Sequence, residues 1–301
     1  MGVFASVISQ GNNQSCFCSF STTTSADTLL LDSFLAPALG AASIMTSHDK
    51  YTVERITELH TWTPHLFSFK TTRDRGYRFA PGQFARLGVK KGDETVWRAY
   101  SIVSAHYDEF LEFYSIVVPG GEFTSQLSSL RIDDDIFVER KSYGFLTTDR
   151  FECGKDLWML STGTGLAPFI SILYDFHTWE TYENIILVHS VRNKNELAYE
   201  EVIRSFKENE YFKEFSSRLI YVQSVTRESV PNALNARITT LIENRELEKA
   251  VGIDINADRS RIMICGNPEM VDETRQLLIK NRGLSLSRRG QPGHLAVENY
   301  W

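Results

Sequence analysis

The sequence predicts a two-domain protein, an antiparallel β-barrel followed by an α/β domain with a parallel sheet. Three observations predict it. The chain has 301 residues, about twice the roughly 150 residues of an average domain. Short β-rich runs fill residues 51–142, and beyond Gly154 strands alternate with helices. We expect the boundary at Cys153–Gly154, with domains at residues 50–153 and 154–301.

The first half contains six short runs with the composition of strands. They cover residues 51–60, 66–71, 83–89, 95–103, 111–118 and 136–141. Turn formers separate them, such as Pro119-Gly120-Gly121, after which a short helix is expected at 124–130. Six strands with close turns are typical of an antiparallel barrel.

The second half alternates between strands and helices. Strands are expected at 157–162, 185–190, 218–225 and 262–265. Helices are expected after them at 167–177, 196–207, 238–247 and 269–281. This order predicts a parallel sheet with helices on its faces.

Composition excludes several functional classes. The net charge is −6 and no segment is strongly basic, which argues against a nucleic-acid partner. No run of eighteen apolar residues lacks a charge, so stable membrane insertion is not expected. The four cysteines are too few for a disulfide framework and lack metal-ligand spacing, so we expect no metal, and any redox chemistry needs an organic cofactor. We expect a cytoplasmic monomer.

Residues 1–49 differ from the rest of the chain. They contain no Lys or Arg and fourteen Ser or Thr, a composition that orders poorly. We expect a disordered extension, or a biological start at Met45. An amphipathic helix at 29–44 is the third possibility.

A glycine turn follows the strand expected at 157–162. Gly163-Thr164-Gly165 stands between that strand and the next helix, where backbone N–H groups converge and glycine admits a ligand close to the backbone. A nucleotide phosphate or ribose fits such a turn. Pro168 occupies the place of the third glycine in the NAD fingerprint, so a plain tight turn is the alternative.

Three arginines lie near the ends of the later strands. Arg192 and Arg227 each follow a strand, and Arg237 opens the next helix. Because the carboxyl ends of parallel strands share one edge, the three could converge on one phosphate, which argues for NADP(H) over NAD(H). The alternative is three solvated loop charges.

One strand of the barrel carries a second candidate site. Arg98 and Tyr100 alternate with Ala99, so they share a face and offer a cation for a diphosphate beside a flat ring for stacking. An ordinary exposed strand is the alternative.

Together these motifs resemble those of the ferredoxin–NADP(+) reductase family. Arg98-Ala99-Tyr100-Ser101 resembles its RxYS flavin motif, residues 163–169 resemble its pyridine-nucleotide motif, and residues 265–270 resemble its CGxxxM segment. The ending Glu298-Asn299-Tyr300-Trp301 is similar to that of the bacterial-type members. The resemblance runs from Tyr51 to Trp301.

The resemblance implies FAD and NADP(H) as cofactors and assigns residues to each. FAD would be held by Arg98, Ala99, Tyr100, Ser101, Tyr114, Glu122, Phe123, Thr124, Tyr300 and Trp301. NADP(H) would be held by Thr162, Gly163, Thr164, Gly165, Arg192, Arg227, Arg237, Gly266, Asn267 and Met270. Tyr100, Cys265, Glu298 and Tyr300 would lie at the reacting rings. The tail would return to the flavin; which terminal aromatic covers flavin and which adenine stays open.

The implied activity is electron transfer between NADPH, which gives hydride, and a one-electron carrier, ferredoxin or flavodoxin. Alternatives are an NAD(P)H-dependent reductase of free flavin or of an oxygenase partner, and a non-catalytic flavin or nucleotide sensor. An acidic carrier would be steered by a basic rim. Candidates for that rim are Arg73, Arg75, Arg78, Arg86, Lys90, Lys91, Lys280, Arg282, Arg288 and Arg289.

Overall fold

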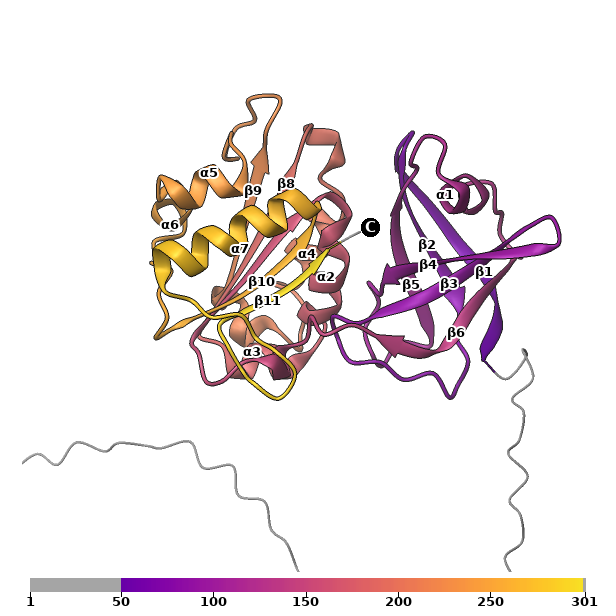
Figure 1. Cartoon of the computed structure of the whole chain (residues 1–301), viewed down its shortest axis with the longest axis horizontal. Helices are drawn as coiled ribbons and strands as arrows, with labels where there is room; N and C mark the ends of the chain where they lie inside the picture. The colour runs from indigo at the N-terminus through magenta and orange to yellow at the C-terminus, as the bar shows by residue number, and fades with distance from the viewer. Residues whose placement is uncertain (1–49, 300–301) are drawn as a thin grey trace, which may run out of the picture. The chain divides into compact units, whose positions relative to one another are not determined.

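The computed structural model describes residues 50–299, which form two β-sheets with their helices (Figure 1). The predictions made for residues 1–49, for Tyr300 and for Trp301 lie outside the described residues.

The first sheet is antiparallel and has six strands in the order β4-β3-β6-β1-β2-β5. Its strands are β1 (Tyr51–Thr63), β2 (Leu66–Thr72), β3 (Phe84–Lys91), β4 (Glu94–Ser101), β5 (Phe110–Ile116) and β6 (Asp135–Tyr143). The two outer strands approach each other, since Ile102 forms a bridge with Phe113 and the hydroxyls of Tyr100 and Ser115 lie 3.0 Å apart. The sheet therefore curls into the predicted barrel.

Apolar side chains fill this barrel because alternate residues of its strands point inward. Phe69, Leu87 and Phe113 are each 1% exposed or less. The helix α1 (Glu122–Leu127) begins two residues earlier than predicted and buries Phe123 and Leu127 on the same core.

The second sheet is parallel, in the order β11-β10-β7-β8-β9. Its strands are β7 (Asp156–Thr162), β8 (Asn184–Val191), β9 (Leu219–Val225), β10 (Ser260–Gly266) and β11 (Leu295–Asn299). The strand β11 was expected only as a tail. It forms because β10 offers a free edge, pairing Cys265 with Glu298 and Gly266 with Asn299.

Helices cover both faces of this sheet, which confirms the predicted α/β arrangement. They are α2 (Ala167–Leu173), α3 (Phe176–Thr181), α4 (Glu200–Ser205), α5 (Ile238–Glu243), α6 (Glu246–Val251) and α7 (Pro268–Arg282). One core packs α2 and α4 against Leu157 and Met159, and the other packs α5 and α7 against Trp158 and Leu160. Successive strand residues thus serve opposite faces, as the pleat requires.

Two predicted helices are each divided in the structure. The helix expected at 167–177 ends at Leu173, and α3 begins after Asp175, whose carboxylate accepts the His177 N–H at 3.2 Å. The helix expected at 238–247 is broken at Arg245, which has φ +64°. Capping and backbone conformation at single residues decided both breaks.

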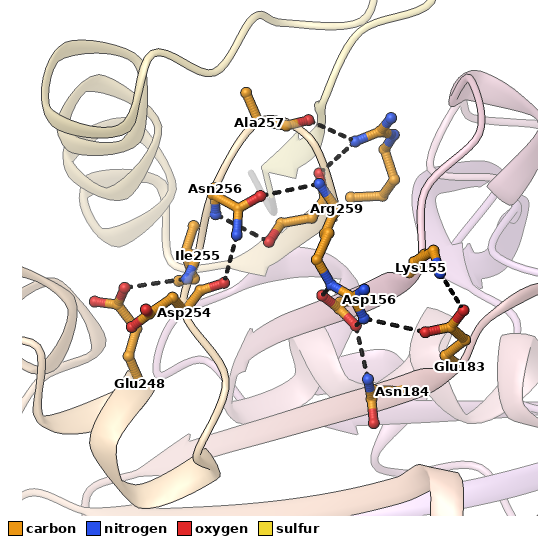
Figure 2. Close-up of polar contacts among 12 residues, drawn as sticks. Lys155, Asp156, Glu183, Asn184, Glu248, Asp254, Ile255, Asn256, Ala257 and Arg259 are labelled. Carbon is orange, nitrogen blue, oxygen red and sulfur yellow. Dashed lines mark hydrogen bonds and ion pairs between the residues drawn. The ribbon is translucent and has the colours of Figure 1, made fainter. Parts of the chain in front are cut away.

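A buried carboxylate ties the amino ends of three parallel strands together (Figure 2). Asp156 is fully buried and receives hydrogen bonds from Arg259 at 2.9 and 3.0 Å and from Asn184 at 2.7 Å. Arg259 also reaches Glu183, which pairs with Lys155. Because Asp156 begins β7 and Asn184 begins β8, the network stabilises the end of the sheet away from the glycine turn.

Within residues 50–299, no helix is long and apolar enough to cross a membrane. The same part of the chain contains no group of three or more His, Cys, Asp or Glu side chains arranged to hold a metal ion.

Candidate functional site

A cavity of about 350 Å³ opens on the barrel beside β4. All eight barrel residues that the resemblance assigns to FAD line it: Arg98, Ala99, Tyr100, Ser101, Tyr114, Glu122, Phe123 and Thr124. Ser115, Ile116, Val118, Gly121, Thr164 and Asn299 complete the wall. Strand β4 and the turn before α1 thus converge on one space, although they are far apart in the sequence.

Arg98 and Tyr100 give this cavity a cation and a flat ring. Arg98 is exposed and donates to the carbonyl of Trp97 at 2.8 Å, which leaves most of its guanidinium donors available. The Tyr100 ring packs 5.4 Å from that of Phe123, and burial raises the pKa of Tyr100 to about 12. Tyr100 is therefore a neutral phenol at physiological pH. These residues fit an anionic cofactor with an aromatic ring system.

A carboxylate from β11 approaches the same strand. The Ser101 hydroxyl donates to Glu298 Oε1 at 3.4 Å, and Glu298 Oε2 lies close to Gly144, where a Cβ atom would stand 2.9 Å from it. Burial raises the pKa of Glu298 to about 7, although the Ser101 hydroxyl opposes this rise. Glu298 can therefore hold or release a proton near neutral pH.

A second cavity, of about 380 Å³, lies at the carboxyl ends of the parallel strands. Nine residues predicted to hold NADP(H) line it: Thr162, Gly163, Thr164, Arg192, Arg227, Arg237, Gly266, Asn267 and Met270. Glu269, within the predicted segment from Gly266 to Met270, also lines it. Sequence reasoning missed further lining residues: Ile116, Ser190, Val191, Glu196, Thr226, Ile238, Thr239 and Glu273. Val191, Thr226 and Ile238 each adjoin a predicted arginine in the chain, which is the signal that could have found them, whereas the others carry no such signal.

The three predicted arginines share the rim of this second cavity. All are exposed, and the backbone N–H of Arg227 donates to the carbonyl of Arg192 at 3.0 Å. Among the residues that the structure describes, none of the three guanidinium groups has an acidic partner within ion-pair distance. Three cations at one rim fit a phosphate that arrives with the ligand.

The two glycines of the turn have different surroundings. Gly163 has φ +53° and open space where a Cβ would stand, and it lines the cavity. Gly165 lines neither cavity. It faces β10 instead, where a Cβ atom would press on the backbone carbonyl of Cys265. Gly165 thus lets the turn pack directly on β10, and the prediction that it contacts the nucleotide has no support from the cavity walls.

Cys265 pairs with Glu298 in the register of β10 and β11, and neither residue lines a cavity. The Cys265 side chain is fully buried in the core that α2 covers. The assignment of both residues to the reacting rings stays a prediction. Tyr300 and Trp301 are outside the described residues, so the arrangement of the terminal aromatics also stays a prediction.

Ile116 and Thr164 line both cavities. Ile116 ends β5, and Thr164 lies inside the glycine turn. A ligand in the barrel cavity and a ligand in the sheet cavity would therefore meet at these two residues.

Comparison with known proteins identifies the class first. The oxidoreductase FAD-binding domain family matches residues 52–142, and the oxidoreductase NAD-binding domain family matches residues 159–276. The chain therefore combines two oxidoreductase domains in the predicted order.

Relatives at higher similarity identify the family. The chain is 44% identical to a ferredoxin–NADP reductase of Azotobacter vinelandii over 250 residues, which cover 82% of this chain and 96% of the relative. It is 36% identical to a flavodoxin/ferredoxin–NADP reductase of Escherichia coli over 247 residues, 82% and 97% of the two chains. The chain belongs to the ferredoxin–NADP reductase family, and the resemblance seen in its motifs is confirmed.

A solved structure gives the same result. The ferredoxin–NADP(+) reductase of Neisseria gonorrhoeae, described with bound FAD and NADP, is 36% identical and matches with a TM-score of 0.78. The match covers 84% of this chain and 99% of that one.

Proposed function

We propose that this chain is an FAD-dependent oxidoreductase that passes electrons between NADPH and a one-electron carrier, ferredoxin or flavodoxin, and acts as a monomer. The observation that carries the proposal is the common wall of the two cavities at Ile116 and Thr164. A ring held against β4 and a nicotinamide delivered over the glycine turn would meet there. The family membership supports the same reaction.

The proposal assigns the barrel cavity to FAD and the sheet cavity to NADP(H). Arg98 would bind the diphosphate, and Tyr100 would pack its ring on the flavin. Arg192, Arg227 and Arg237 would bind the adenosine phosphate, which NAD(H) lacks. Residues 50–153 and 154–301 would be the two functional domains.

A flavin in the first cavity supplies the chemistry, since it accepts a hydride and releases electrons singly. The side chains around it position the rings and manage charge. Tyr100 stays neutral and adds no charge to the cavity. Glu298 holds a proton on its carboxyl oxygens below about pH 7, at hydrogen-bond distance from Ser101.

The basic rim proposed for carrier docking is smaller in the structure than in the sequence. Arg73 donates to the backbone carbonyls of His106, Asp108 and Tyr77. Lys91 pairs with Glu122 at 2.7 Å, and Arg282 is mostly buried against Glu248. These three cations are engaged within the chain and do not fit a docking role.

The exposed cations that remain for a carrier are Arg75, Arg78, Arg86, Lys90, Lys280, Arg288 and Arg289. Arg86 lies 3.5 Å from Glu139, and the Lys90 ammonium lies 5.2 Å from the ring centre of Phe137. Both contacts are at the surface and weak. Arg78 donates to the carbonyls of Arg75 and Tyr77 at 2.7 and 2.9 Å but stays exposed, whereas Arg73 is half-buried. We propose that these seven steer an acidic carrier.

The test uses the full-length protein purified with its colour. Mixing with NADPH in a stopped-flow instrument should bleach a bound flavin, and NADH should do so much more slowly. A panel of ferredoxins, flavodoxins, free flavin and cytochrome c then separates a carrier reductase from a free-flavin reductase. Bound flavin that NADPH does not bleach would favour a sensor.

Salt dependence tests the docking proposal separately. Electron transfer to ferredoxin should slow as ionic strength rises, while reduction of a small neutral dye by NADPH should change little. Equal salt dependence of both reactions would reject steering by the exposed cations.

A further inference from the structure

Tyr199 joins the loop after β8 to the barrel. Its side chain is 3% exposed, and its hydroxyl donates to Glu112 Oε1 at 2.7 Å. Its ring lies 5.0 Å from the ring of Trp62 and 5.2 Å, edge-on, from the ring of Tyr114. A residue of the α/β half is thus packed among three residues of the barrel.

The backbone of Tyr199 is in the left-handed region, with φ +60° and ψ +13°. For a residue with a Cβ atom this conformation is strained. Local sequence does not favour it, so the contacts of the side chain must hold it. The strain directs the Tyr199 ring toward the barrel just before α4 begins.

On the barrel side, Tyr199 contacts the face of β5 that ends at the cavities. Glu112, Tyr114 and Ile116 are two residues apart and share that face. Tyr114 and Ile116 line the barrel cavity, and Ile116 also lines the sheet cavity.

On the sheet side, a short series of hydrogen bonds in the loop connects Tyr199 to Arg192 at the cavity rim. The Glu196 carboxylate accepts the backbone N–H of Arg192 and the side-chain amide of Asn193, both at 3.1 Å. The Glu196 carbonyl accepts the N–H of Ala198 at 2.8 Å. The position of Arg192 is therefore linked to that of Tyr199.

We propose that Tyr199 is a positioning residue that ties the Arg192 loop to the β5 wall. It sets the span between the arginines and the place where the two cavities meet. A dinucleotide that must reach both ends needs this span, whereas a fragment that reaches only the arginines does not. The inference rests on the proposed function, because it takes NADP(H) as the ligand of the sheet cavity.

The test measures nucleotide affinity by calorimetry on the FAD-loaded protein, which does not require turnover. Tyr199→Phe removes the hydroxyl and keeps the ring. We expect it to raise the Kd for NADP(+) by about fivefold or more, at the lower end of couplings between sites. The Kd for 2′,5′-ADP should change less than about twofold, since the hydrogen bond from the Arg192 N–H to Glu196 stays intact.

Two further variants separate positioning from stability. Ser171→Ala removes another buried hydrogen bond between the halves, from Ser171 Oγ to the carbonyl of Ser104 at 2.9 Å, and should lower the melting temperature while leaving both Kd values unchanged. Glu112→Gln keeps an acceptor oxygen for Tyr199 and should bind NADP(+) as the unmodified protein does.

Three outcomes would overturn the inference. They are an unchanged Kd for NADP(+) in Tyr199→Phe, an equal loss for NADP(+) and 2′,5′-ADP, and the same loss in Ser171→Ala. A protein that binds NADP(+) but never oxidises NADPH would instead reject the proposed function, while the comparison of Kd values would still decide the role of Tyr199.

Discussion

The Glu298 carboxylate lies 3.4 Å from the Ser101 hydroxyl, joining the last described strand to β4 across 197 positions of the sequence. Ser101 is buried and lines the barrel cavity, so this contact places an ionisable group next to a residue of the cavity wall, although Glu298 itself lines neither cavity. The burial of Glu298 raises its pKa to about 7, into the range where the protein would work.

The raised pKa of Glu298 leads us to expect that the rate of NADPH oxidation depends on pH. The carboxyl is protonated below about pH 7 and carries a negative charge above it. Hydride transfer to an FAD bound in the barrel cavity would bring negative charge near Ser101 and its partner, so ionised Glu298 would oppose it. We expect dye reduction at saturating NADPH to fall as the pH rises from 6 to 8, and Glu298→Gln to remove this fall.

A matched control for that experiment is Glu94→Gln, which changes an exposed carboxylate at the other end of β4. It should keep the pH profile of the unmodified protein. A Glu298→Gln profile that still falls around pH 7 would show that another group controls the rate.

We expect Arg227 to contribute to the preference for NADPH over NADH. It is exposed at the cavity rim without an acidic partner among residues 50–299, so its loss should not harm the fold. A charge-assisted hydrogen bond to phosphate contributes about 1.5–3 kcal/mol, so Arg227→Leu should raise the KM for NADPH about tenfold or more. The KM for NADH should stay within about twofold, because NADH lacks that phosphate.

The control for Arg227 is Arg204→Leu, which removes an exposed arginine whose ion-pair partner within residues 50–299 is Glu200 on α4. It should leave the KM for NADPH unchanged. Equal increases of the KM for NADPH and NADH in Arg227→Leu would mean that Arg227 contacts a part common to both nucleotides.

The glycine turn predicts unequal costs for two alanine substitutions. Gly163→Ala places a methyl group in open space at φ +53°, so only the backbone strain of roughly 1–2 kcal/mol applies. Gly165→Ala drives a methyl group into the carbonyl of Cys265, and that backbone belongs to a central strand that cannot move aside. We expect Gly165→Ala to cost about 3 kcal/mol or more, the upper end of what overpacking costs, because the methyl group meets backbone atoms and not a flexible side chain.

Urea unfolding of the two glycine variants, followed by tryptophan fluorescence, measures both costs. A free energy of unfolding for Gly165→Ala equal to that for Gly163→Ala would contradict the close packing of the turn on β10.

The Asp156–Arg259 pair predicts a stability effect at the opposite end of the sheet. Arg259→Leu leaves the fully buried Asp156 carboxylate with Asn184 as its remaining side-chain donor (Figure 2). Removing the partner of a buried carboxylate is strongly destabilising, and the partial exposure of Arg259 moderates the loss. Thermal unfolding should show the loss, while the affinity for NADP(+) stays the same.

Lys155→Ala is the comparison for Arg259→Leu. It breaks the exposed Lys155–Glu183 pair of the same network and should cost less than about 1 kcal/mol. Similar costs for the two variants would mean that Asp156 does not depend on Arg259.

The sequence alone was enough to predict the two-domain order, most strands, and the parts of the cavity walls that contain Arg98, Tyr100, the glycine turn and the three arginines. These features depend on local patterns. Alternating residues placed Arg98 and Tyr100 on one face of β4, and glycines after β7 marked the turn that lines the sheet cavity. The family resemblance added Tyr114 and the residues from Glu122 to Thr124, all of which line the barrel cavity.

Tertiary structure alone decided the features that need a partner distant in the chain. The strand β11 forms because β10 offers an open edge, and Tyr199 adopts φ +60° because Glu112 and Trp62 hold it. The raised pKa of Glu298 likewise comes from burial by other segments. Local sequence encodes periodicity and turns, whereas pairing, burial and backbone strain depend on which distant residues packing brings together.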